Sequence, residues 1–145
     1  MSREVKQSPR ACSVADALGV VGDRWSLLVL RELGMGVRRF GGIQANTGAP
    51  RDILTARLRK LEAAGVIERK AYSDRPPRSE YVLTDSGRAL GPVLMALQEW
   101  GDTFLNAGRE PRLLQHDCGD RFHAAVACAA CGGLVAEGAL VDVQD

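Results

Sequence analysis

Two pairs of side chains near the C-terminus have the types and spacing of metal ligands. His116 stands two residues before Cys118, and Cys128 stands three residues before Cys131. A glycine follows each pair and allows the chain to turn, so that backbone amides can point at the thiolates. Thiolate and imidazole ligands favour zinc, and structural zinc sites use four protein ligands in a tetrahedron. We therefore expect one structural zinc ion held by His116, Cys118, Cys128 and Cys131, as in a zinc ribbon.

The sequence leaves alternatives to this metal site open. The His-x-Cys spacing is tighter than Cys-x-x-Cys, and His123 could replace His116 as the fourth ligand. Without a metal, the cysteines would be free thiols, or Cys128 and Cys131 would form a redox disulfide. A small enzyme that uses this dithiol is a further hypothesis, but the chain lacks the βαβ pattern in which such motifs usually lie.

Cys12 is a candidate redox sensor. It precedes the first expected helix and lies close to Arg10 in the chain. Helix N-termini and nearby cations favour the thiolate and so increase the reactivity of a cysteine. The alternative is a small buried residue without chemistry of its own.

The composition gives little support to other enzyme chemistry. The chain has 145 residues, about one domain, and its two histidines both lie near the C-terminus. It contains no Gly-x-Gly-x-x-Gly, no Gly-x-Ser-x-Gly and no His-Glu-x-x-His. No apolar stretch is long enough to span a membrane, and the polar N-terminus does not resemble a secretory signal. We expect a cytoplasmic protein that is not an enzyme and does not contact membranes.

The basic residues are concentrated in the middle of the chain. The formal net charge is only +1, yet residues 1–90 carry 16 Lys and Arg against ten Asp and Glu, whereas residues 91–145 carry three against eight. The excess lies in residues 38–78, with ten basic and four acidic side chains. A basic segment beside an acidic one indicates a polyanionic partner for the middle of the chain only.

Hydrophobic periodicity predicts several helices and one β-hairpin. Ser13 and Thr84 are expected to cap helices, and Pro50 suits a first helical position after a tight turn at Gly48. The hairpin has a proline-rich, basic tip. The expected helices lie at 14–21, 39–47, 51–64, 85–107 and within 22–36, and the expected strands lie at 66–72 and 79–83.

This order of elements predicts a mainly α fold with a small β-hairpin, a winged helix-turn-helix. We expect a flexible arm at 1–11, a DNA-binding and dimerisation domain with a long C-terminal helix at 12–107, and a small zinc-ribbon-like tail at 108–145. In such folds the second helix of the helix-turn-helix enters the major groove, and the hairpin reaches the neighbouring backbone or minor groove.

The helix at 51–64 is the candidate recognition helix. Its apolar face comprises Ile53, Leu54, Leu58, Leu61 and Ala64. On the other face, Arg51 and Arg59 can bind guanine, and Thr55 can contact a thymine methyl group or a phosphate. Arg57 falls on the apolar side, so we expect its head group to pair with an acidic residue. The candidate DNA contacts are Arg38, Arg39, Arg51, Asp52, Thr55, Arg59, Lys60, Arg75 and Arg78.

Five segments carry a family resemblance: CSVADALGVVGDRWSLLVLREL, RRFGGIQ, LTARLRKLEAAGVIERKAY, PPRSEYVLTDSGRAL and LQEWG. Together they span about Cys12 to Gly101, and they resemble the HxlR family of bacterial winged-helix transcription regulators. The resemblance implies a homodimer that binds a pseudo-palindromic operator, usually as a repressor. It places the dimer interface at about 13–21 and 85–106. It also implies that a cysteine at the place of Cys12 senses electrophiles or oxidants in some members.

The sequence therefore predicts a sequence-specific double-stranded DNA-binding transcriptional regulator, a repressor that responds to a small-molecule or redox signal. The alternative is a protein-interaction adaptor whose winged helix does not touch DNA and whose Cys/His tail docks a partner. The basic segment at 38–78 argues against the adaptor. A steep salt dependence of DNA binding separates the two hypotheses.

Overall fold

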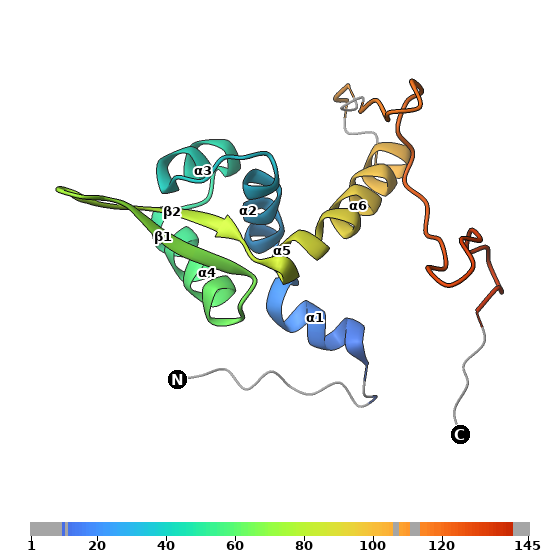
Figure 1. Ribbon diagram of the computed structural model, residues 1–145, viewed down its shortest axis with the longest axis horizontal. Helices are drawn as coiled ribbons and strands as arrows, with labels where there is room; N and C mark the ends of the chain where they lie inside the picture. Colours follow the sequence, from blue (N-terminus) through green and yellow to red (C-terminus); the bar gives the residue numbers. More distant parts are fainter. Residues whose placement is uncertain (1–9, 11, 106–107, 111–113, 141–145) are drawn as a thin grey trace. The chain divides into compact units, whose positions relative to one another are not determined.

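The computed structural model describes residues 10, 12–105, 108–110 and 114–140. It confirms the expected mainly α fold with one antiparallel β-hairpin (Figure 1). The chain divides into two compact units between Gly91 and Pro92. The elements are α1 (Ser13–Val21), α2 (Arg24–Gly34), α3 (Phe40–Thr47), α4 (Arg51–Ala63), β1 (Ile67–Asp74), β2 (Pro77–Leu83), α5 (Asp85–Ala89) and α6 (Gly91–Phe104).

The arm predicted at 1–11 lies outside the described residues except for Arg10, and so do residues 106–107 at the end of the predicted long helix. The division into 12–107 and 108–145 stays a prediction. Within the described ranges, no helix is both long enough and apolar enough to cross a bilayer.

The core of the first unit lies between α2, α3, α4 and the start of β1. Its fully buried apolar side chains are Val29, Leu30, Ile43, Leu54, Leu58, Leu61 and Ile67. The three buried leucines of α4 recur at helical spacing, as the predicted apolar face requires. Ala64 was predicted on the same face but is exposed, because α4 ends at Ala63.

Two carboxylates join the helices of this unit. Glu32 of α2 is 1% exposed, and its carboxylate accepts hydrogen bonds from Arg31 and, at 2.8 Å, from Asn46 Nδ2 of α3. Asp23 caps α2, where its carboxylate accepts the Ser26 N–H at 2.9 Å and the Ser26 hydroxyl at 2.7 Å. Because a buried carboxylate without partners is costly, the Asn46 contact of Glu32 stabilises the packing of α3 on α2, and Asp23 stabilises the start of α2.

A tight turn joins α3 to α4. Gly48 ends α3 with φ of 72°, in the left-handed region that favours glycine. The Thr47 hydroxyl donates to the Ile43 carbonyl at 2.7 Å and accepts the Ala49 N–H at 3.3 Å. Pro50 is the N-cap of α4 and not its first helical residue, one position earlier than predicted. The turn therefore sets the direction in which α4 leaves α3.

The hairpin pairs Ile67 with Leu83 at its base and Asp74 with Pro77 at its tip. Both strands run two residues further toward the tip than predicted. A proline can begin a strand because that position needs no backbone N–H in the ladder. The register is irregular between Ala71 and Ser73, so Tyr72 has no paired residue opposite it. Such irregularities redirect a side chain locally.

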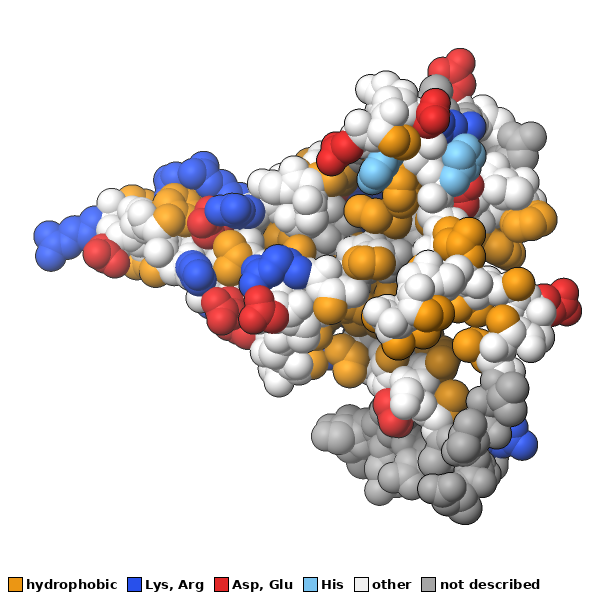
Figure 2. All heavy atoms as spheres, turned by 45° about the vertical axis from the view of Figure 1, so that its right-hand side comes forward, with side chains coloured by type: hydrophobic (Ala, Val, Ile, Leu, Met, Phe, Trp, Pro, Cys, Tyr) orange, Lys and Arg blue, Asp and Glu red, His pale blue; other side chains and the backbone are white. Residues whose placement is uncertain are grey.

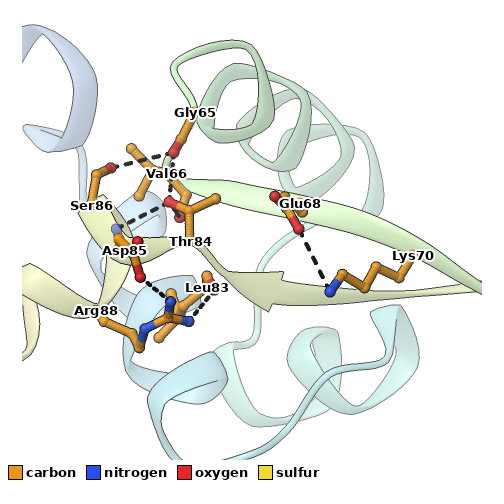
Figure 3. Close-up of polar contacts among 10 residues, drawn as sticks. Gly65, Val66, Glu68, Lys70, Leu83, Thr84, Asp85, Ser86 and Arg88 are labelled. Carbon is orange, nitrogen blue, oxygen red and sulfur yellow. Dashed lines mark hydrogen bonds and ion pairs between the residues drawn. The ribbon is translucent and has the colours of Figure 1, made fainter.

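The segment after the hairpin packs against the end of α4 (Figure 3). The Thr84 hydroxyl accepts the Gly87 N–H at 3.3 Å, which confirms the predicted cap, and it donates to the Gly65 carbonyl at 2.6 Å. Gly87 is buried, and a Cβ atom there would lie 2.2 Å from the Val66 carbonyl oxygen. Ser86 also donates to the Gly65 carbonyl, at 3.3 Å. The hydrogen bonds to the Gly65 carbonyl hold the start of α5 close to the start of the β1–β2 hairpin.

Two predicted helix boundaries are wrong. The single helix expected at 85–107 is divided into α5 and α6, with Leu90 between them. Pro92 explains the division, since proline has no N–H to donate and its ring clashes with the carbonyl four residues earlier. At the other end of the chain, Ser13 is the first residue of α1 and Cys12 is its N-cap. No side-chain cap hydrogen bond forms at Cys12.

The second unit consists of α6 and the tail that follows it. No residue of α6 is buried. The described part of the tail contains two isolated β-bridges, Gln115 with Arg121 and Ala127 with Leu134, in agreement with the short β-like pieces expected there. The side chain of His123 reaches back to α6, where Nδ1 lies 2.8 Å from Glu99 Oε1.

Candidate nucleic-acid interface

The polar face of α4 is open to solvent. Arg51, Asp52 and Arg59 are exposed, and Thr55 is half-buried. The Thr55 hydroxyl donates to the Arg51 carbonyl at 2.8 Å, so that its methyl group remains for an apolar contact. The structure therefore gathers four of the predicted contact residues on one helix face, as their spacing requires.

Aromatic rings support two of the arginines. The guanidinium carbon of Arg51 lies 5.1 Å from the centre of the Phe40 ring, and that of Arg39 lies 4.6 Å from the centre of the Tyr72 ring. Cation–π contacts of this kind restrict where a long arginine side chain points. Sequence reasoning assigned no such role to Phe40 or Tyr72. The sequence carries no local pattern for the contact between Tyr72 and Arg39, because the two residues are 33 positions apart in the chain.

Arg38 and Lys60 have acidic partners. Arg38 Nη1 lies 3.8 Å from Glu80 Oε1 on β2. The backbone carbonyl oxygen of Arg38 accepts the Tyr81 N–H at 2.8 Å. Lys60 Nζ lies 3.9 Å from Asp23 Oδ2. Both contacts are long and partly exposed, so they orient these cations more than they neutralise them.

Arg57 faces the protein and not the solvent side of α4. Its Nε lies 3.1 Å from Asp23 Oδ1, which confirms the predicted pairing with an acid, although the angle is not that of a hydrogen bond. Desolvation by burial raises the pKa of Asp23, but the hydrogen bonds from Ser26 and the charges of Arg57 and Lys60 outweigh it and lower that pKa below 3.8. Arg57 therefore joins α4 to the N-cap residue of α2.

The wing carries the second group of basic residues (Figure 2). Arg75 and Arg78 are exposed at the tip, and neither makes an ion pair with any residue in the described ranges. Arg69 and Lys70 of β1 are also exposed, and Lys70 Nζ lies 3.7 Å from Glu68 Oε2. The predicted set omitted these two strand residues, although both belong to the basic segment at 38–78.

The candidate sensor Cys12 is exposed and stands at the N-terminus of α1. Its carbonyl oxygen accepts the Asp16 N–H at 3.1 Å, while its thiol is free. The position agrees with the one that the sequence predicts.

The predicted metal ligands lie in two turns of the tail. His116 and Cys118 share the first turn, and Cys128 and Cys131 share the second. The backbone N–H groups of Cys131 and Ala130 lower the pKa of the Cys128 thiol. Hydrogen bonding to His123 lowers the pKa of Glu99. Within the described part of the chain, no three His, Cys, Asp or Glu side chains come together at metal-binding distance, so each pair stands by itself.

The turn between α3 and α4, the basic face of α4 and the β1–β2 hairpin define a winged helix-turn-helix protein. The chain belongs to the HxlR-like helix-turn-helix family, whose model matches residues 20–109. It is 44% identical over 122 residues to the HTH-type transcriptional regulator Rv3095 of Mycobacterium tuberculosis. The aligned region covers 83% of this chain and 77% of Rv3095.

Solved structures show the same fold. The crystal structure of PA1607 has a TM-score of 0.80 and 36% identity, and the match covers 94% of this chain and 97% of that one. The oxidised form of the redox regulator HypR has a TM-score of 0.59 and 33% identity, covering 63% of this chain and 96% of HypR. The family is one of transcriptional regulators and not of enzymes, as the sequence predicts.

Proposed function

We propose that this protein regulates transcription by binding double-stranded operator DNA with α4 in the major groove. The observation that carries the proposal is the exposed basic face of α4, which lies in the same compact unit as the basic wing. Arg51 and Arg59 suit bidentate contacts with guanine, and Asp52 suits the amino group of cytosine. The methyl group of Thr55 suits a thymine methyl group, because its hydroxyl is already bonded to the backbone.

Phosphate contacts would come from the flanking elements. Arg75 and Arg78 at the wing tip have no ionic partner among the described residues, so they are free to bind phosphates or the minor groove. Arg38 and Arg39 precede α3, and Lys60 follows the base-reading residues of α4. These cations position the helix and add affinity that does not depend on base sequence.

The proposed active form is a homodimer. Val93, Leu97, Trp100 and Phe104 lie on one face of α6 and are each about half exposed or more. On α1, Val14 and Leu18 are 65% and 57% exposed. Apolar patches of this kind mark association surfaces. A two-fold dimer would present two copies of α4 to a pseudo-palindromic operator.

The proposed mode of action is repression relieved by a signal. Cys12 stands at the start of α1, one of the two helices with exposed apolar surface, so that its modification would act close to the proposed interface. HypR, a structural relative, is a redox regulator. Oxidation of Cys12, or a small-molecule effector near the interface, would change the spacing of the two α4 helices. Operator DNA as the target implies a cytoplasmic protein.

Selection of bound duplexes from a random pool tests this function. The purified full chain should enrich a palindromic consensus whose half-sites are one helical turn apart, or a multiple of it. Affinity for that consensus should fall steeply as salt concentration rises. Enrichment of no sequence, together with weak binding that is insensitive to salt, would favour the adaptor function instead.

A further inference from the structure

Each Cys/His pair of the tail sits in a turn closed by its own β-bridge. In the first turn, the His116 N–H donates to the Asp120 carbonyl at 3.0 Å, and the Gly119 N–H donates to the His116 carbonyl at 2.9 Å. In the second, the Cys128 N–H donates to the Gly133 carbonyl at 2.9 Å, and the Gly132 N–H donates to the Cys128 carbonyl at 2.7 Å. The turns therefore hold each pair of donor side chains close together without a metal.

Glycines make both turns possible. Gly119 has φ of 93° and Gly132 has φ of 72°, both in the region where other side chains are strained. Each of these glycines directly follows a cysteine of the proposed set. The two turns thus share a local design, although one carries His-x-Cys and the other Cys-x-x-Cys.

Backbone N–H groups in the turns point at the donor atoms. The Gly133 N–H donates to Cys131 Sγ at 3.4 Å, and the Cys118 N–H donates to His116 Nδ1 at 3.3 Å. The Cys118 contact orients the His116 ring so that Nδ1 faces its own turn. Metal-bound thiolates commonly accept hydrogen bonds from backbone N–H groups.

The two histidines that the sequence left as alternatives have different surroundings. Nδ1 of His123 lies 2.8 Å from Glu99 Oε1 on α6. That contact anchors the tail to α6 and leaves the other ring nitrogen of His123 open, as in a metal-bound histidine that pairs with a carboxylate. His116, in contrast, shares a turn with Cys118 and is exposed.

Among the large apolar side chains of the described tail, only Leu114, Phe122 and Val135 are half-buried, and the others are exposed. Val126, Leu134 and Leu140 are 65%, 73% and 76% exposed. A segment with so little buried apolar surface needs another source of order, and metal binding is one that small segments commonly use.

We propose that the two turns are the halves of one structural zinc site, with His116, Cys118, Cys128 and Cys131 as its four ligands. Among the described residues, these four donor side chains do not lie together, so the two turns must approach each other when the metal binds. Nine residues separate Cys118 from Cys128, which is enough chain to span about 30 Å when extended. Binding of Zn²⁺ would displace the thiol protons of the three cysteines and order the tail.

Metal analysis of the full-length protein, purified without chelator, tests this site. We expect about one zinc per chain. Replacement by Co²⁺ should give the visible and near-ultraviolet absorption of a tetrahedral, thiolate-ligated ion. Only Cys12 of the four cysteines should then react quickly with a thiol reagent, and all four should react after chelation. DNA binding does not enter these readouts, so the outcome is independent of the proposed function.

Matched variants assign the ligands. His116→Ala, Cys118→Ser, Cys128→Ser and Cys131→Ser should each lose the bound zinc, whereas His123→Ala and Cys12→Ser should keep it. Chelation should increase hydrogen exchange in 114–140 and leave that of α2 and α4 unchanged. Protein without zinc that takes up no Co²⁺ and has four freely reactive thiols would overturn the proposal. Equal loss in His123→Ala, or zinc that is bound only between two chains, would also overturn it.

Discussion

Asp23 is a single residue that joins α2 to α4, because its carboxylate caps one helix and faces two cations of the other. We expect Asp23→Ala to lower the free energy of unfolding by about 1–2 kcal/mol at neutral pH, since it removes the cap and leaves Arg57 unpaired. Urea unfolding measures the change. Asp23→Asn keeps a capping side chain and should lose less.

The pH dependence of this contribution has a defined sign. The pKa of Asp23 in the folded protein is below its usual value of 3.8, so its stabilising effect is present above that value and is lost as pH falls through the folded pKa. The difference between wild type and Asp23→Ala should therefore shrink in acid. Glu62→Ala, a change on the exposed side of α4, serves as the control. An unfolding difference that stays constant from neutral pH to strong acid would contradict the assignment.

The arginines of the interface divide into two kinds with different tests. Arg51→Ala or Arg59→Ala should cost about 1–3 kcal/mol per half-site and relax the base preference. Arg75→Ala or Arg78→Ala should weaken binding to all sequences and flatten the dependence of affinity on salt. Binding titrations on consensus and scrambled duplexes at several salt concentrations distinguish the two.

Arg121→Ala is the control for these variants, because it removes the same charge from the tail. It should leave both affinity and salt dependence close to those of the wild type. If Arg59→Ala weakened binding to scrambled and consensus duplexes equally, its role as a base contact would be wrong.

Phe40 is expected to act through Arg51. Phe40→Leu removes the ring under the guanidinium and should weaken operator binding by about 0.5–1 kcal/mol without altering the salt dependence. Phe40→Tyr keeps an aromatic face and should bind like the wild type. Thermal unfolding of both variants shows whether the change in affinity merely follows a loss of stability.

Among the elements, α5 depends on a close backbone approach to the start of β1. Gly87→Ala would place its Cβ 2.2 Å from the Val66 carbonyl oxygen, a contact that the backbone cannot relieve without moving. We expect a loss of about 1–3 kcal/mol in the free energy of unfolding. Gly91→Ala is the matched control, since its Cβ would meet nothing within 4 Å. Equal stability of the two variants would contradict this packing.

At the scale of the whole molecule, the apolar face of α6 predicts the oligomeric state. Leu97 is 49% exposed and Trp100 is 50% exposed, although both are large apolar residues. Leu97→Glu should convert a dimer into a monomer at micromolar concentration and weaken operator binding. Gln98→Glu adds the same charge about 100° further around the helix, away from the line of Val93, Leu97, Trp100 and Phe104, and should remain dimeric. Sedimentation velocity measures the oligomeric state of both variants. A wild-type protein that is a monomer and stays monomeric on DNA would contradict the proposed dimer.

The order of the elements and the polarity of their faces follow from local patterns in the sequence. Residues that bury α4 recur at helical spacing, and Gly48 and Thr84 mark helix ends through their own backbone and side-chain chemistry. The concentration of basic residues at 38–78 is likewise a property of composition. Such features are local, so they can be recognised without knowing how distant segments meet.

Which side chains meet across the fold depends on how the elements pack. Tyr72 lies under Arg39 because a register irregularity in β1 redirects it, and Asp23 reaches Arg57 across two helices. His123 contacts Glu99, 24 positions earlier, and spacing alone does not predict this contact. Contacts between residues far apart in the chain depend on the packing of whole elements, and no pattern within a short segment contains that information.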